Sequence, residues 1–88
     1  MEKKKIQDII IKMINKINPI DQKYKKNIDK FDFMSSGHID SIEILKFNFE
    51  IEDKFKISIK PNESVKKSYR TIGGLSSIIL KKLSKKLK

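Results

Sequence analysis

Apolar residues recur at helical spacing in three separate segments of the chain, and this spacing restricts its fold more than any other feature. In segments 3–17, 41–55 and 72–83 they lie three or four positions apart, which predicts helices with an apolar face. Segment 56–60 alternates polar and apolar residues, but it is too isolated to find a partner strand, so we expect an extended connector. The pattern therefore predicts an all-α fold.

A small four-helix bundle is the architecture that suits 88 residues with no internal repeat and no cysteine. A short helix at 62–69 is expected to accompany the three main ones. Residues 18–39 have no helical period, so we expect a long loop between the first and second helices. Three apolar residues of this loop are expected to pin it to the core: Phe31, Phe33 and Met34. The whole chain, 1–88, then forms a single domain.

Proline, threonine and glycine mark the expected ends of these helices. The pair Asn18-Pro19 ends the first helix, because the residue before a proline is disfavoured in the α region. Thr71 is a suitable N-cap for the last helix, which we expect to continue to about Leu87. The pair Gly73-Gly74 lies in the first turn of that helix, where the missing side chains allow another element to approach closely.

Charge is unevenly distributed along the chain. The net charge of +10 is typical of proteins that bind nucleic acids or anionic membrane surfaces. Residues 29–53, however, contain seven acidic and two basic residues, so this segment carries −5 and the remainder carries +15. The acidic residues are Asp29, Asp32, Asp40, Glu43, Glu50, Glu52 and Asp53. They surround the most distinctive motif of the chain.

This motif, Gly37-His38-Ile39-Asp40-Ser41-Ile42, places a serine directly after an aspartate where the second helix is expected to begin. Asp40 is a good N-cap, because its carboxylate can accept a first-turn N–H and its charge suits the positive helix end. His38 has no evident orienting group or oxyanion-hole donors beside it, so a catalytic role with Ser41 is not expected. The displayed hydroxyl suits covalent modification by another enzyme, and the protein itself is not expected to be an enzyme.

The second predicted helix carries two apolar stripes. At about 100° per residue, one stripe faces the core and consists of Ile44, Phe47, Ile51 and Phe55. The second stripe either packs against the long loop or the short helix, or is an exposed strip for a transient partner. Because Ser41 lies at its head, we favour a partner-docking surface. Its expected residues are Ile42, Glu43, Leu45, Phe49, Glu52 and Asp53.

With these residues in view, the chain resembles the acyl carrier proteins and the related peptidyl carrier proteins. The likeness covers nearly the whole chain. The matching positions are Gly37, Asp40, Ser41 and Ile42 in the motif, Glu52, Asp53 and Phe55 at the end of the second helix, and Thr71 and Ile72 at the start of the last. The chain departs from the family in its strongly basic charge, in Lys46, Asn48 and Lys54 on the second helix, and in His38.

The resemblance implies that Ser41 receives 4′-phosphopantetheine from coenzyme A through a Mg²⁺-dependent phosphopantetheinyl transferase. Asp40 would help this transferase to place metal and phosphate, and Ile42 would complete the attachment site. The thiol of the arm would carry an acyl or aminoacyl group as a thioester. Its partners would be a loading enzyme and downstream synthases of a fatty-acid, polyketide or nonribosomal-peptide pathway. The cargo cannot be read from the sequence.

Two other functions stay open from the sequence: a small basic nucleic-acid-binding module and an interaction module with an unmodified serine. The first is opposed by the single arginine of the chain and by the lack of a helix face with Arg, Asn or Gln. The lysine-rich end, 81–88, is expected to be a frayed, solvated helix end; the alternative is that it docks an acidic partner or an anionic membrane surface. No apolar run approaches the roughly 20 residues that span a bilayer. We expect a cytoplasmic monomer without nucleic acid, membrane insertion or a metal site.

Overall fold

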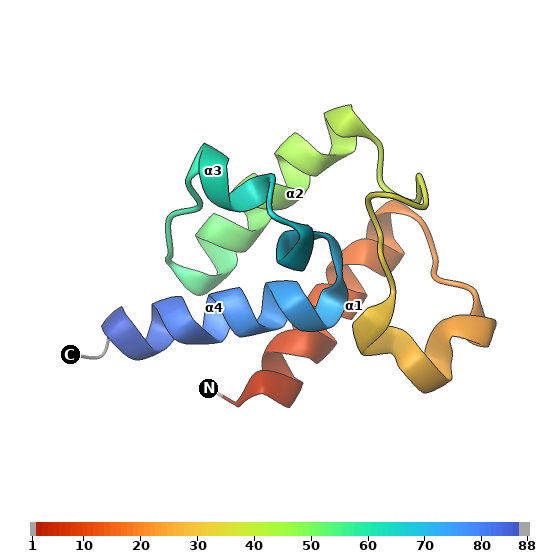
Figure 1. The fold of residues 1–88 in the computed structure, drawn as a ribbon, viewed down its shortest axis with the longest axis horizontal. Helices are drawn as coiled ribbons and strands as arrows, with labels where there is room; N and C mark the ends of the chain where they lie inside the picture. Colours follow the sequence, from red (N-terminus) through yellow and green to blue (C-terminus); the bar gives the residue numbers. More distant parts are fainter. Residues whose placement is uncertain (1, 87–88) are drawn as a thin grey trace.

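Three helices of 15 residues each build the fold (Figure 1). They are α1 (Lys3–Ile17), α2 (Ser41–Phe55) and α4 (Ile72–Lys86). The connections contain the short helix α3 (Pro61–Ser64) and two 3₁₀ helices, η1 (Gln22–Lys30) and η2 (Lys67–Arg70). The computed structural model describes residues 2–86, and in this range the only β pairing is one isolated bridge between Asp32 and Thr71. The predicted all-α bundle is confirmed.

Helix α4 packs against α1, η1 and η2, whereas α2 packs against α1 and lies along the upper edge of the bundle (Figure 1). One face of each long helix supplies the core. The buried residues are Ile6, Ile10 and Ile14 of α1, Ile44, Phe47, Ile51 and Phe55 of α2, and Ile72, Leu75 and Ile79 of α4. Burying each such side chain contributes about 1.5–3 kcal/mol to folding. The predicted core stripe of α2 is therefore confirmed.

The segment between α1 and α2 is more ordered than the expected loop. Its first part forms η1, which Asp21 caps by accepting a hydrogen bond from the Lys23 N–H at 2.9 Å. A kink at Asn27 (φ −126°, ψ 42°) divides η1 into two short pieces. Such pieces lack the 3.6-residue period of an α-helix, which is why the apolar spacing did not predict them. Phe31 and Phe33 are buried and Met34 is half-buried, as expected.

The prediction of one short helix at 62–69 is wrong, because this segment forms two separate short helices, α3 and η2, with a non-helical turn between them. Val65 lies at this break and is 70 % exposed, whereas Tyr69 is fully buried. The preceding connector forms neither a helix nor a strand over residues 57–60, and its last residue, Lys60, has an extended backbone. It leaves α2 through Lys56, whose left-handed backbone (φ 56°) ends the helix. Within residues 2–86, no helix is long and apolar enough to cross a membrane.

The first turn of α4 is pressed against two neighbouring backbone segments. A Cβ atom at Gly74 would lie 1.9 Å from the carbonyl oxygen of Ser68, and one at Gly73 would lie 2.9 Å from that of Asp29. The close approach expected from the glycine pair is thus confirmed. Thr71 caps the helix, because its Oγ1 accepts a hydrogen bond from the Gly74 N–H at 3.0 Å. Leu87, where we expected α4 to end, lies outside the described residues.

Candidate functional site

A reciprocal cap fixes the N-terminal end of α2. Asp40 has an extended backbone, and its Oδ1 accepts hydrogen bonds from the N–H groups of Ile42 (3.0 Å) and Glu43 (2.8 Å). The Glu43 carboxylate accepts the Asp40 N–H in return, at 3.2 Å. Such a capping box satisfies backbone donors that the helix leaves without partners. The predicted N-cap is confirmed, and Glu43 belongs to it as well.

Ser41 is the first residue of α2, and its side chain is exposed. Within residues 2–86 its hydroxyl has no hydrogen-bond partner. Two serines inside α4, Ser76 and Ser77, differ, because their hydroxyls donate to the carbonyls of Ile72 (2.7 Å) and Gly73 (3.1 Å), respectively. The Ser41 hydroxyl thus lies at a capped helix end and is open to a reagent from solution.

His38 is engaged with the end of α1. Its Nε2 hydrogen-bonds the carbonyl oxygen of Asn18, and the Asn18 side-chain amide donates to the His38 carbonyl at 3.2 Å. A ring nitrogen that meets a carbonyl oxygen must carry the proton. The ring also makes an edge contact with Phe31, with ring centroids 5.1 Å apart. Through these contacts His38 fastens the loop before α2 to the C-terminal end of α1.

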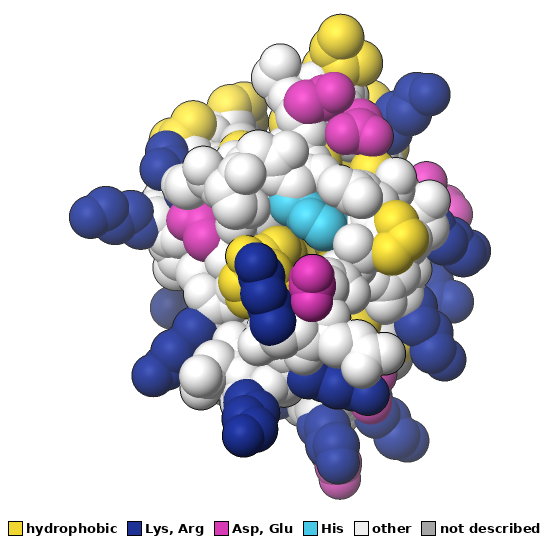
Figure 2. Space-filling view, turned by 90° about the vertical axis from the view of Figure 1, so that its right-hand side faces the viewer, with side chains coloured by type: hydrophobic (Ala, Val, Ile, Leu, Met, Phe, Trp, Pro, Cys, Tyr) yellow, Lys and Arg dark blue, Asp and Glu magenta, His cyan; other side chains and the backbone are white. Residues whose placement is uncertain are grey.

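The second apolar stripe of α2 is exposed. Ile42, Leu45 and Phe49 are 72 %, 61 % and 70 % exposed, so this stripe does not pack against the loop or the short helix. Figure 2 shows hydrophobic and acidic side chains together at the top of the molecule, over the start of α2, and Lys and Arg side chains around the sides and the lower part. Contiguous exposed apolar side chains of this kind mark interaction surfaces.

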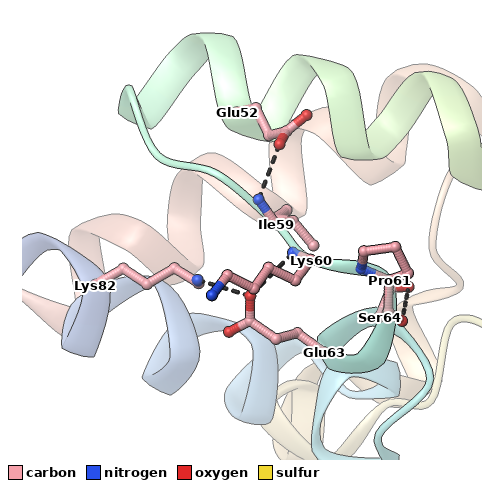
Figure 3. Close-up of polar contacts among 7 residues, drawn as sticks. All are labelled: Glu52, Ile59, Lys60, Pro61, Glu63, Ser64 and Lys82. Atoms are coloured by element: carbon pink, nitrogen blue, oxygen red, sulfur yellow. Dashed lines mark hydrogen bonds and ion pairs between the residues drawn. The ribbon is translucent and has the colours of Figure 1, made fainter.

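The acidic residues expected beside this stripe have different environments. Asp53 is exposed and forms a loose ion pair with Lys56 at 3.6 Å. Glu52 is half-buried and accepts the Ile59 N–H at 2.8 Å, so it holds the connector against α2 (Figure 3). Exposed Glu50 makes no ion pair within the described part of the chain. Glu50 and Asp53 are therefore better placed than Glu52 or Glu43 to meet a partner through charge alone.

Two polar contacts beyond the motif had not been anticipated. The hydroxyl of the buried Tyr69 donates a hydrogen bond to the side-chain oxygen of Asn48, which explains a polar residue on the inner side of α2. Burial raises the pKa of the Tyr69 phenol, and the charges of Glu52 and Glu63 raise it further. The only sequence signal was Asn48 itself, because a polar group on a buried face needs a partner.

The second contact joins α3 to α4. The Glu63 carboxylate accepts hydrogen bonds from the Lys82 ammonium at 2.8 Å and from the Lys60 N–H at 2.9 Å (Figure 3). The bond from Lys82 holds the pKa of Glu63 below its ordinary value, and the bond from Lys60 acts in the same direction. Together with the bond between Glu52 and Ile59, this contact fixes the connector and α3 between the two long helices.

Chemically, the start of α2 offers one exposed nucleophilic oxygen, one adjacent carboxylate and an apolar strip. No group of three or more His, Asp or Glu side chains within residues 2–86 is arranged to hold a metal ion. No protein-family model, curated protein or solved structure matches the chain. The residues themselves therefore carry the functional argument.

Proposed function

We propose that the protein is an acyl or aminoacyl carrier, which holds its cargo as a thioester on a 4′-phosphopantetheine arm attached to Ser41. One observation supports this proposal above the others: an exposed hydroxyl without a hydrogen-bond partner among the described residues, directly behind the Asp40 cap. In this proposal the protein is not itself an enzyme. It works as a monomer in the cytoplasm, where coenzyme A and the synthases that use the arm are found.

The residues around Ser41 fit such an arm. The hydroxyl is exposed, so no side chain must move to admit a phosphodiester. The phosphate would lie at the positive end of the α2 dipole, which favours negative charge. Asp40 already occupies the N–H groups of Ile42 and Glu43, so the dipole and solvent, rather than those donors, would stabilise the phosphate. The chain has no cysteine, so the arm would supply the thiol that carries the cargo.

Attachment requires a transferase and Mg²⁺. The Ser41 oxygen forms a new bond to the phosphorus of coenzyme A that bears the pantetheine, and the bond from this phosphorus to the nucleotide portion breaks. A base of the transferase takes the hydroxyl proton, and the nucleotide leaves as a bisphosphate. Asp40 is adjacent to the reacting oxygen and would help to hold Mg²⁺, because carboxylates are preferred ligands of this ion.

The exposed strip on α2 would bind the transferase, the loading enzyme and the downstream synthases in turn. Ile42, Leu45 and Phe49 supply an apolar centre, Asp53 lies at its charged rim, and Glu50 lies further round the helix, in a hollow between α2 and α1. An interface with such a centre and rim suits short-lived complexes. The partners would need basic patches that complement this acidic helix. The strip is locally acidic even though the whole chain carries +10.

The proposal is tested by incubating the purified chain with coenzyme A, Mg²⁺ and a phosphopantetheinyl transferase of broad specificity, followed by intact-protein mass spectrometry. We expect a mass gain of one phosphopantetheine, and none in Ser41→Ala. Ser58→Ala is the matched control, because Ser58 is also exposed, and it should gain the same mass. A gain that persists in Ser41→Ala, or no gain with several transferases, would contradict the proposal.

An interaction module with an unmodified serine is the second candidate, and the exposed strip on α2 favours it equally. It predicts a chain that stays unmodified in the mass assay but loses a partner when Phe49 is replaced by serine. The mass assay thus separates the two candidate functions, because only a carrier gains the mass of a phosphopantetheine.

A further inference from the structure

A cluster of lysines lies at the end of the molecule opposite Ser41. Two adjacent hollows of about 250 and 380 Å³ lie there between the connector, α3 and α4, and they share Lys82 and Lys85. Six lysines line these hollows, and we call them the lysine face: Lys56, Lys60, Lys66, Lys81, Lys82 and Lys85. Glu63 is the single acidic residue that lines them, so the lining carries a formal charge of +5.

The charge of the lysine face is only partly neutralised within the molecule. Lys82 is paired with Glu63 at 2.8 Å, and Lys56 with Asp53 at 3.6 Å. Lys66, Lys81 and Lys85 are exposed, and they form no ion pair with another described residue. Gathering several like charges on one surface opposes folding through self-repulsion. An anionic surface outside the molecule would relieve this repulsion.

The composition of the lysine face favours a lipid surface over a protein or a nucleic acid. The centres of protein interfaces are depleted in lysine and enriched in aromatic residues and arginine. Nucleic-acid recognition uses Arg, Asn or Gln at base edges or aromatic rings against bases. None of these residue types lines the two hollows, whose remaining residues are Ile57, Ser58, Ser68 and Ile78. A bilayer rich in anionic headgroups requires only a dense positive charge, which lysine supplies.

We propose that the lysine face binds the surface of a membrane rich in anionic phospholipid. The protein would adsorb without inserting, because the face is charged. Adsorption would leave Ser41 accessible, since it lies 14 positions before Phe55, the residue that ends α2 next to the connector, a length of about 21 Å at the helical rise. In Figure 1 the last turns of α4 and the connector lie at the left, whereas α2 begins at the top right. This inference goes beyond the proposed carrier function and does not depend on it.

The test uses sedimentation of the unmodified full chain with vesicles of phosphatidylserine and phosphatidylcholine in about 0.1 M salt, near physiological screening. The informative variant is Lys66→Gln, Lys81→Gln, Lys85→Gln. Each lysine near such a surface changes the partition coefficient about fivefold, so this triple variant should bind about 100-fold more weakly. The control is Lys25→Gln, Lys26→Gln, Lys30→Gln on η1, which removes the same charge from exposed positions elsewhere. The control should bind within about fivefold of the original chain, because remote charges are screened.

Salt, lipid composition and competing nucleic acid provide further tests of membrane binding by the lysine face. Release from the vesicles by high salt and no binding to pure phosphatidylcholine would support the proposal. Equal losses in both triple variants would overturn it, because net charge rather than the lysine face would then govern binding. Tighter binding to a duplex or single-stranded oligonucleotide than to the vesicles, in the same salt, would also overturn it. Ser41→Ala should bind vesicles as the original chain does, so this test can fail or succeed independently of the carrier proposal.

Discussion

Helices α2 and α4 have the same length, but they differ in how much of their apolar surface is exposed. Each has 15 residues and begins behind a side-chain cap, Asp40 in α2 and Thr71 in α4. The apolar side chains of α4 that the structure describes are all buried or half-buried. Helix α2 instead leaves Ile42, Leu45 and Phe49 mostly exposed. The same local rules thus produce one helix that is covered and one that displays an apolar face.

The difference follows from the positions of the two helices. α4 is covered by α1, η1 and η2, and glycines in its first turn let two backbone segments come close. α2 contacts mainly α1, so within residues 2–86 one of its faces has no neighbouring helix. The fold does not require apolar residues on that face, because polar residues would be equally compatible with an exposed helix surface. The described apolar side chains of α4 therefore serve the fold, whereas Ile42, Leu45 and Phe49 add little to the core, and the proposed function assigns them to partner docking.

The largest effect on stability is expected at Phe47 of α2. Phe49, on the same helix, provides the exposed comparison. Phe47 is fully buried and Phe49 is 70 % exposed. Phe47→Ala should lower the free energy of unfolding by about 4 kcal/mol, because it removes core contacts and leaves a cavity. Phe49→Ala should change it by less than about 0.5 kcal/mol. Urea unfolding measures both, and similar losses would show that the outer face of α2 also serves the fold.

Gly74→Ala tests the covered start of α4. The new Cβ would overlap the carbonyl oxygen of Ser68, and we expect a loss of about 3 kcal/mol through forced backbone shifts. Alanine otherwise favours a helix over glycine by about 1 kcal/mol, so steric overlap and helix propensity predict opposite signs. Thermal unfolding of this variant gives the answer. A stabilised protein would mean that η2 can move away from α4 at little cost.

Two variants of Asp40 distinguish its role as a helix cap from the role of its negative charge in loading by the transferase. Asp40→Ala removes the acceptor for the Ile42 and Glu43 N–H groups and should cost about 1 kcal/mol of stability. Asp40→Asn keeps a good cap and should cost much less. If the carboxylate serves the transferase, both variants should be loaded with phosphopantetheine more slowly than the original chain. Normal loading of Asp40→Asn would limit Asp40 to a structural role.

The smallest effect concerns the contact between α3 and α4 and its dependence on pH. The pKa of Glu63 is lowered from its ordinary value of 4.5 by the hydrogen bond from Lys82. Its contribution to stability is therefore complete above about pH 4.5 and is lost as the pH falls through the lowered pKa. Glu63→Gln should flatten this part of the stability curve by less than about 1 kcal/mol, since solvent reaches the pair. Denaturant titrations between pH 6 and about pH 3 would reveal it, whereas an unchanged slope would show that Glu63 does not contribute.

The bounds of α1 and α2 could be predicted because apolar spacing and a capping aspartate are local signals. The start of α4 followed from Thr71 in the same way. Contacts between distant segments could not be predicted, such as the bond between Tyr69 and Asn48, which are 21 positions apart. From the sequence, Glu52 was expected to be a surface charge. In the structure the connector passes beside it, and its carboxylate accepts a hydrogen bond from the Ile59 N–H. The lysine face likewise depends on packing, because it joins the connector to the last turns of α4.

The proposed function depends on the Ser41 hydroxyl, which lies at the start of the helix with the exposed apolar face. The most direct measurement is the intact mass of the protein isolated from its own cells, followed by fragmentation of the peptide that spans 31–46, released by cleavage after lysine. This peptide contains Ser35, Ser36 and Ser41, so fragmentation assigns the modified position. The account predicts a phosphopantetheine on Ser41 in at least part of the population. A chain that is always unmodified, or modified only at Ser35 or Ser36, would contradict it.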